Sequence, residues 1–116
     1  MVEMIKGSGV DVSLDMSKLP ILDGALDTVR AGILSSLQPA NVRLRRAIKN
    51  VEDASSHDVY PLIFDPQTSG GLLAALPSEK AEACVTDLHN RGYPDATIVG
   101  KVVREGDAIE PVTLTW

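Results

Sequence analysis

The residues best suited to chemistry lie in one polar segment between two apolar runs, PLIF and GLLAALP. This segment consists of Asp65, Pro66, Gln67, Thr68, Ser69, Gly70 and Gly71. Its glycines lack a Cβ, so the backbone there can take a positive φ or approach another group closely. Its hydroxyls and carboxylate add polar contacts, and such a loop can point backbone N–H groups at an anion. A tight turn with an Asx-turn at Asp65 uses the same residues without any ligand, so the residues alone leave both interpretations open.

A basic cluster provides a second candidate for binding chemistry. It consists of Arg43, Arg45, Arg46 and Lys49. If residues 41–49 are helical, the apolar side chains among them cover one side of the helix and these cations cover the rest. The cluster is then either a solvated face or a surface that steers phosphate groups toward a cleft.

The remaining reactive side chains do not suggest a site. Cys84 lies among apolar neighbours at helical spacing, as a small core residue does. His57 and His89 are far apart in the sequence, and no Cys/His spacing matches a zinc site. We therefore expect no metal ligands and no catalytic residue in this chain.

Length and composition limit the possible classes of protein. A chain of 116 residues predicts a single domain. Hydrophobic residues make up 44% and aromatic residues 3%, so the core must consist mainly of Leu, Val, Ile and Ala. The net charge of -5 argues against a nucleic-acid or anionic-membrane surface. One cysteine and the absence of a long apolar run predict a soluble protein of the cytoplasm.

Hydrophobic periodicity in the first half predicts one strand and two helices. Alternation places Val10, Val12 and Leu14 on one face of a strand over residues 10–14, with Asp11 on the other face. Apolar residues at helical spacing predict a helix over residues 22–33, weakened by Gly24. A short helix is expected to begin near Asn41.

In the second half, PLIF and GLLAALP read as core strands on either side of the polar loop. A helix is expected from Ser78, which would be its N-cap, to the C′ glycine Gly92. Residues 96–105 and 109–116 predict two final strands. The expected fold is therefore an α+β sandwich: a mixed, mainly antiparallel sheet with helices packed on it, partly ferredoxin-like.

The motif FDPQTSGGLLAALP, with GSGVDVSLDMSKLPILDGA and ATIVGKVV, resembles the C-terminal domain of the selenide, water dikinases, or selenophosphate synthetases. That family belongs to the ATP-binding enzymes related to aminoimidazole ribonucleotide synthetase. The resemblance implies that residues 1–116 follow an N-terminal domain, absent here, that binds the nucleotide and forms a homodimer. It also implies a parent enzyme that makes selenophosphate from selenide, ATP and water, with Mg²⁺, and releases AMP and phosphate.

By the same resemblance, the family's catalytic Cys or selenocysteine and its magnesium-binding Asp residues precede this sequence. Cys84 does not match that position. We expect this chain alone to be inactive and to bind no cofactor tightly. The segment GILSSLQPANVRLRRAI stands where many members carry GGT.RN, which leaves Asn41 as the counterpart and Arg43 as a second candidate.

Two other functions remain open at this point. The parent enzyme is another member of the same ATP-dependent group, such as an aminoimidazole ribonucleotide synthetase or a thiamine-phosphate kinase. Alternatively, the chain is a free-standing module for ligand sensing or oligomerisation, a use that strand-helix-strand-strand units often have.

Overall fold

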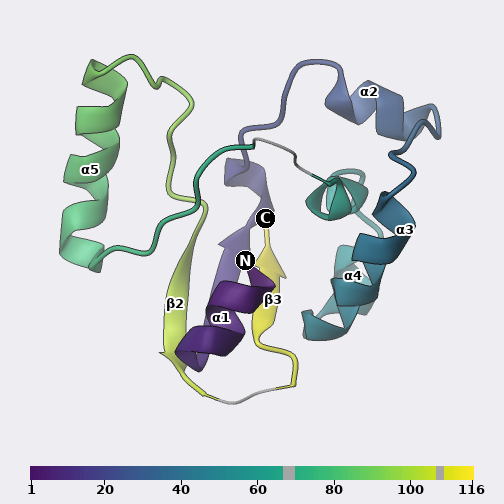
Figure 1. Cartoon of the computed structure of the whole chain (residues 1–116), viewed down its shortest axis with the longest axis horizontal. Coiled ribbons are helices and arrows are strands. Elements are labelled where there is room, and N and C mark those ends of the chain that lie inside the picture. The colour runs from purple at the N-terminus through teal and green to yellow at the C-terminus, as the bar shows by residue number, and fades with distance from the viewer. Residues whose placement is uncertain (67–69, 107–108) are drawn as a thin grey trace.

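A computed structural model describes residues 1–66, 70–106 and 109–116, and within them three strands form one mixed sheet (Figure 1). The strands are β1 Val10–Asp15, β2 Gly100–Glu105 and β3 Val112–Thr115. Their order is β2-β1-β3, with β1 antiparallel to β2 and parallel to β3. The expected α+β fold with a mixed sheet is confirmed. The last two strands are shorter than predicted, since residues 96–99 and 109–111 lie outside them.

Strand β1 does not keep the simple alternation that its sequence predicts. The register with β2 shifts between Asp11 and Val12, and Asp11 is buried rather than facing solvent. Arg104 Nε of β2 donates a hydrogen bond to Asp11 Oδ2 at 2.6 Å. A register shift re-aims the side chains beside it, and this one places a carboxylate where a guanidinium covers it.

Short helices make up most of the described first half (Figure 1). They are α1 Val2–Ser8, η1 Met16–Lys18, α2 Ala25–Arg30, α3 Gln38–Asn41, η2 Val42–Ala47, α4 Val51–Ala54 and η3 Tyr60–Phe64, where η marks a 3₁₀-helix. Helix α2 is shorter than the predicted 22–33 because glycines with positive φ flank it, Gly24 at 80° and Gly32 at 73°. The helix expected near Asn41 begins earlier, at Gln38, and continues as the 3₁₀-helix η2.

Both strands predicted beside the polar loop are wrong. PLIF belongs to η3, where Pro61 occupies the first turn, a position that needs no backbone N–H. GLLAALP forms no strand, and all of its described residues, 71–77, are exposed. An apolar run becomes a strand only where a neighbour takes up its backbone hydrogen bonds, and these residues pair with no strand.

Helix α5, Ser78–Asn90, confirms the helix predicted in the second half. The expected N-cap is wrong, because Pro77 takes the N-cap position and Ser78 is the first helical residue. The C-terminus follows the prediction: Gly92 has φ 93°, and Tyr93 N donates to Leu88 O as in a Schellman motif. None of the thirteen described residues of α5 is buried, and Figure 1 shows the helix standing beside the sheet.

The core lies between β1 and β3 of the sheet and the short helices of the first half. Its buried apolar residues are Ile5, Leu14, Met16, Ala47, Ile48, Ala54, Phe64, Val112 and Leu114. Helix α5 contributes none of them, and the Cα radius of gyration is 14.7 Å, against about 13 Å for a compact chain of this length. No helix of the described residues is long and apolar enough to cross a membrane.

A candidate phosphate-facing loop

The candidate loop runs from η3 to an exposed segment, and it is not a corner between two core strands as the sequence suggested. Of its residues, Gln67, Thr68 and Ser69 lie outside the described part of the chain. Gly70 and Gly71 are exposed. At Gly71 an added Cβ would meet no atom within 4 Å, and φ is not positive. A small side chain at Gly71 would thus find free space.

Side-chain amides from α3 hold the start of the loop. Asn41 Nδ2 donates a hydrogen bond to the carbonyl oxygen of Phe64 at 3.0 Å. Gln38, which is only 4% exposed, donates through Nε2 to the carbonyl oxygen of Pro61 at 2.8 Å. The structure therefore brings Asn41, a site residue proposed from sequence, next to the residue that precedes Asp65.

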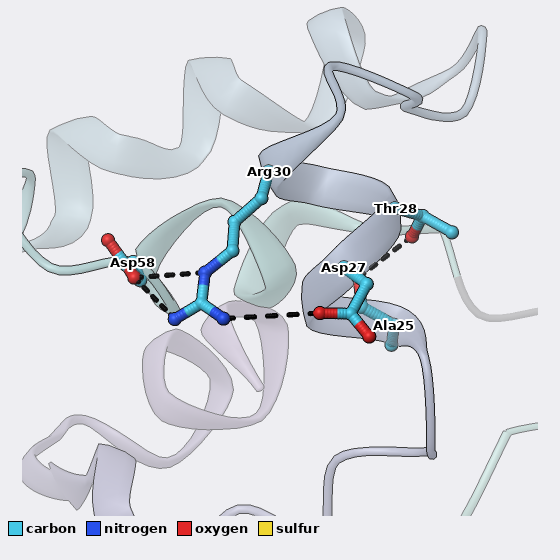
Figure 2. A network of polar contacts seen from close by, with 5 residues as sticks. All are labelled: Ala25, Asp27, Thr28, Arg30 and Asp58. Carbon is cyan, nitrogen blue, oxygen red and sulfur yellow. Dashed lines mark hydrogen bonds and ion pairs between the residues drawn. The ribbon is translucent and has the colours of Figure 1, made fainter.

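Helix α2 also contacts the chain just before η3 (Figure 2). Arg30 donates to Asp58 Oδ2 from Nε at 3.1 Å and from an Nη nitrogen at 2.7 Å. Its other Nη nitrogen lies 4.0 Å from Asp27 Oδ1 on the same helix. Both carboxylates are largely exposed, so these ion pairs orient the segment more than they stabilise it.

The basic cluster lies on η2 and on the residues that follow it. Arg43 is exposed, and no salt bridge recorded for the described residues includes Arg43, Arg45, Arg46 or Lys49. One cation acts on a neighbour: burial raises the pKa of Tyr60, and the charge of Arg45 partly opposes that change. The Tyr60 hydroxyl is buried and has no hydrogen-bond partner among the residues that the structure describes.

The cysteine and the two histidines, which suggested no site in the sequence, lie in ordinary structural positions. Cys84 is half-buried on α5. The ring of His57 stacks on Trp116 with centroids 3.7 Å apart. A ring nitrogen of His89 lies 2.8 Å from the carbonyl oxygen of Ala96. Nothing in these contacts assigns any of them a reactive role.

Comparison with known proteins shows where this arrangement belongs. Residues 1–111 match the family described as "AIR synthase related protein, C-terminal domain". The chain belongs to this family. The resemblance stated from the FDPQTSGGLLAALP motif is therefore confirmed at the level of the domain family.

Several curated proteins that this chain resembles are selenide, water dikinases. The one from Clostridioides difficile (strain 630) is 34% identical over 108 residues, which are 91% of this chain and 30% of the relative. "Selenide, water dikinase 2" of Peptoclostridium acidaminophilum is 35% identical over 101 residues, 87% of this chain and 29% of the relative. The enzyme of Caldanaerobacter subterraneus is 36% identical over 103 residues. The chain thus spans about 30% of the length of the curated relatives it matches.

Two residues near the loop of this AIR synthase related domain were not identified from the sequence. Gln38 is a buried polar residue, and a Gln directly before Pro39 at a helix start is the only signal the sequence offers. Tyr60 gives no signal, because an aromatic residue near a proline is compatible with core and surface positions alike. Gln38 was missed because its role depends on the hydrogen bond that its Nε2 donates to Pro61. Tyr60 was missed because its role depends on the burial of its hydroxyl.

Proposed function

We propose that this chain is the C-terminal domain of a selenide, water dikinase. The observation that supports this best is the similarity to several selenide, water dikinases at 34–36% identity over 86–91% of this chain. The proposed parent enzyme converts selenide, ATP and water to selenophosphate, AMP and phosphate. Its N-terminal domain, its homodimeric assembly and its cytoplasmic location are parts of the same proposal.

The role proposed for this chain is to form one side of the site where phosphoryl groups are transferred. Phosphoryl transfer depends on positioning and charge stabilisation more than on covalent help from the protein. The loop of Asp65, Gln67, Thr68, Ser69, Gly70 and Gly71 supplies N–H groups and hydroxyls for that purpose. The space at Gly71 supports this role, since a Cβ added there would meet no described atom within 4 Å apart from its chain neighbours. Arg43 is a second proposed contact, being an exposed cation on η2.

Mg²⁺ and ATP belong to the proposed parent enzyme. Among the described residues no three or more His, Cys, Asp or Glu side chains come together as metal ligands would. By the family resemblance, we propose that magnesium binding belongs to the N-terminal domain. Within this chain the proposed contributions are hydrogen bonds and positive charge only.

Selenide-dependent formation of AMP by the intact enzyme that contains this chain tests the proposal. We expect AMP to form with selenide, ATP and Mg²⁺, and the isolated chain to form none. An intact protein that forms no AMP in the presence of selenide would contradict the proposed function, as would robust turnover by the isolated chain.

A substitution at Gly71 tests the role of the loop separately. Because a Cβ at this position meets nothing within 4 Å, Gly71→Val should leave the thermal unfolding of this chain nearly unchanged. In the intact enzyme it should lower kcat/KM by about tenfold or more, since displacing a bound group by 1 Å is costly. Unchanged kinetics would restrict the loop to a structural turn.

A second function follows from the family itself, whose description refers to AIR synthase rather than to selenium chemistry. In that case the intact enzyme uses ATP with another substrate. A Cys or selenocysteine closely followed by Lys in the upstream reading frame favours selenide, and the absence of that pair favours the alternative.

A further inference from the structure

Two short helices are joined by matching hydrogen bonds at the start of the candidate loop. On α3, the donors Gln38 and Asn41 are three residues apart. On η3, the accepting carbonyl groups of Pro61 and Phe64 are also three residues apart. We call these two amide-to-carbonyl contacts the amide brace.

The spacing of the amide brace follows from helix geometry. Residues i and i+3 of an α-helix lie on the same face, so both amides of α3 point to the same neighbour. A 3₁₀-helix has three residues per turn, so carbonyls at i and i+3 line up along its axis. The carbonyl of Phe64 lies in the last turn of η3, where no backbone N–H of the same helix is available. Asn41 supplies a donor to this carbonyl.

The brace determines the direction of the chain beyond Phe64. The Phe64 side chain is 5% exposed and belongs to the core, so it anchors the same residue from the other side. Asp65 is extended, with φ -63° and ψ 130°, which is the conformation favoured before a proline. Pro66 then has its own φ restricted by its ring. The backbone is thus defined from α3 as far as residue 66.

Among the described residues, the other end of the loop shows no comparable anchor. Gly70 and Gly71 are exposed, and Leu72 is fully exposed. At the described start of the loop, the hydrogen bond from Asn41 of α3 holds the backbone carbonyl of Phe64.

We propose that Gln38 and Asn41 are positioning residues that hold the start of the candidate loop in place for phosphate binding. This inference rests on the proposed function for its consequence in catalysis, but the brace itself is measurable without it. Neither side chain needs to touch the substrate, because each acts through a backbone carbonyl of η3.

Amide hydrogen exchange in the 116-residue chain tests the brace directly. The variant Asn41→Asp keeps the shape of the side chain and removes its donor. The matched control is Asn90→Asp, which makes the same change at an exposed residue of α5, away from the loop. We expect Asn41→Asp to raise exchange at residues 62–65 about three- to tenfold, as the loss of one hydrogen bond implies. The control should leave those amides unchanged, and equal exchange in both variants would overturn the proposal.

Kinetics of the intact enzyme test the consequence for the reaction. We expect Asn41→Asp to lower kcat at least about tenfold with little change in KM for ATP, and Asn41→Gln, which restores a donor, to recover part of the loss. Asn50→Asp, which removes a donor to the Leu114 carbonyl away from the loop, should lower the melting temperature without this fall in kcat. Wild-type kcat in Asn41→Asp would overturn the inference. If the wild-type enzyme forms no AMP with selenide, the proposed function is contradicted instead. The hydrogen-exchange result alone would then test whether the amide brace exists.

Discussion

The side-chain amide of Asn50 pairs with the backbone of Leu114 in both directions. Its Nδ2 donates to the Leu114 carbonyl at 2.8 Å, and the Leu114 N–H donates to its Oδ1 at 3.0 Å. Strand β3 lies at the end of the sheet order β2-β1-β3. On the side away from β1, the described residues pair with β3 through an isolated bridge between Ile48 and Val112. Asn50 thus supplies the hydrogen bonds that a further strand would have made.

Replacing Asn50 should therefore destabilise the whole domain. Leu114 is 2% exposed, so its N–H and carbonyl would be left buried without partners in Asn50→Ala. We expect the free energy of unfolding to fall by about 1–3 kcal/mol, measured by urea denaturation. Asn90→Ala makes the same change at an exposed residue of α5 and should change stability by less than about 0.5 kcal/mol. Equal effects would show that the Leu114 contacts contribute nothing.

Gly100 should tolerate no side chain. In the antiparallel pair of β1 and β2, a Cβ at this position would overlap the carbonyl oxygen of Ser13. Gly100→Ala should lower stability by about 1–3 kcal/mol, because the two strands must move apart. Gly71→Ala is the matched control, since its Cβ meets nothing. Thermal unfolding of both variants measures this difference. An unchanged melting temperature in Gly100→Ala would show that β1 and β2 can move apart without loss of stability.

Tyr60→Phe should stabilise the protein, and more strongly at alkaline pH. The buried hydroxyl has no hydrogen-bond partner in the described part of the chain, so removing it should add about 1 kcal/mol at pH 7. Burial raises the pKa of Tyr60 above its ordinary value of 10.0, despite Arg45 nearby. The folded state therefore keeps the proton longer than the unfolded state does, and stability falls as pH rises above 10.

That fall should be absent from the variant. Denaturation curves of wild type and Tyr60→Phe between pH 7 and pH 11 measure the difference. Parallel pH profiles for the two proteins would contradict the burial of this hydroxyl.

The ion pair of Arg104 with Asp11 should matter more than those on the surface. The Asp11 side chain is only 12% exposed, so Arg104→Met leaves a carboxylate with little access to water. We expect a loss of about 1–2 kcal/mol, largely recovered when Asp11→Asn is added in a double-mutant cycle. Arg91→Met breaks the exposed pair with Asp87 on α5 and should cost about 0.3–0.5 kcal/mol. Similar losses for the two arginines would contradict the role of burial.

Local patterns predicted some of these elements well. Alternation identified β1, and the apolar stripe with Gly92 identified α5 and its C-terminus. Both predictions succeeded because the signals act within a few residues. The two runs beside the loop were mistaken for strands, because a short apolar run does not reveal whether another strand is available to pair with it.

The candidate site shows the same division. The glycines and hydroxyls of the loop were recognisable from their types and spacing, and Asn41 was suggested by resemblance. The hydrogen bond from Asn41 to Phe64 joins residues 23 positions apart, as does the one from Gln38 to Pro61. No local pattern encodes contacts at that separation.

The sequence by itself determined the class of domain, the family to which the chain belongs and the choice of a candidate loop. These depend on composition, periodicity and motif, which are properties of neighbouring residues. The tertiary structure alone decided that Asn41 serves the Phe64 carbonyl, that Asn50 replaces a strand beside Leu114, and that Asp11 lies buried under Arg104. Each of these contacts joins residues that are far apart in the sequence. Only the packing of the folded chain brings the two groups within hydrogen-bond distance.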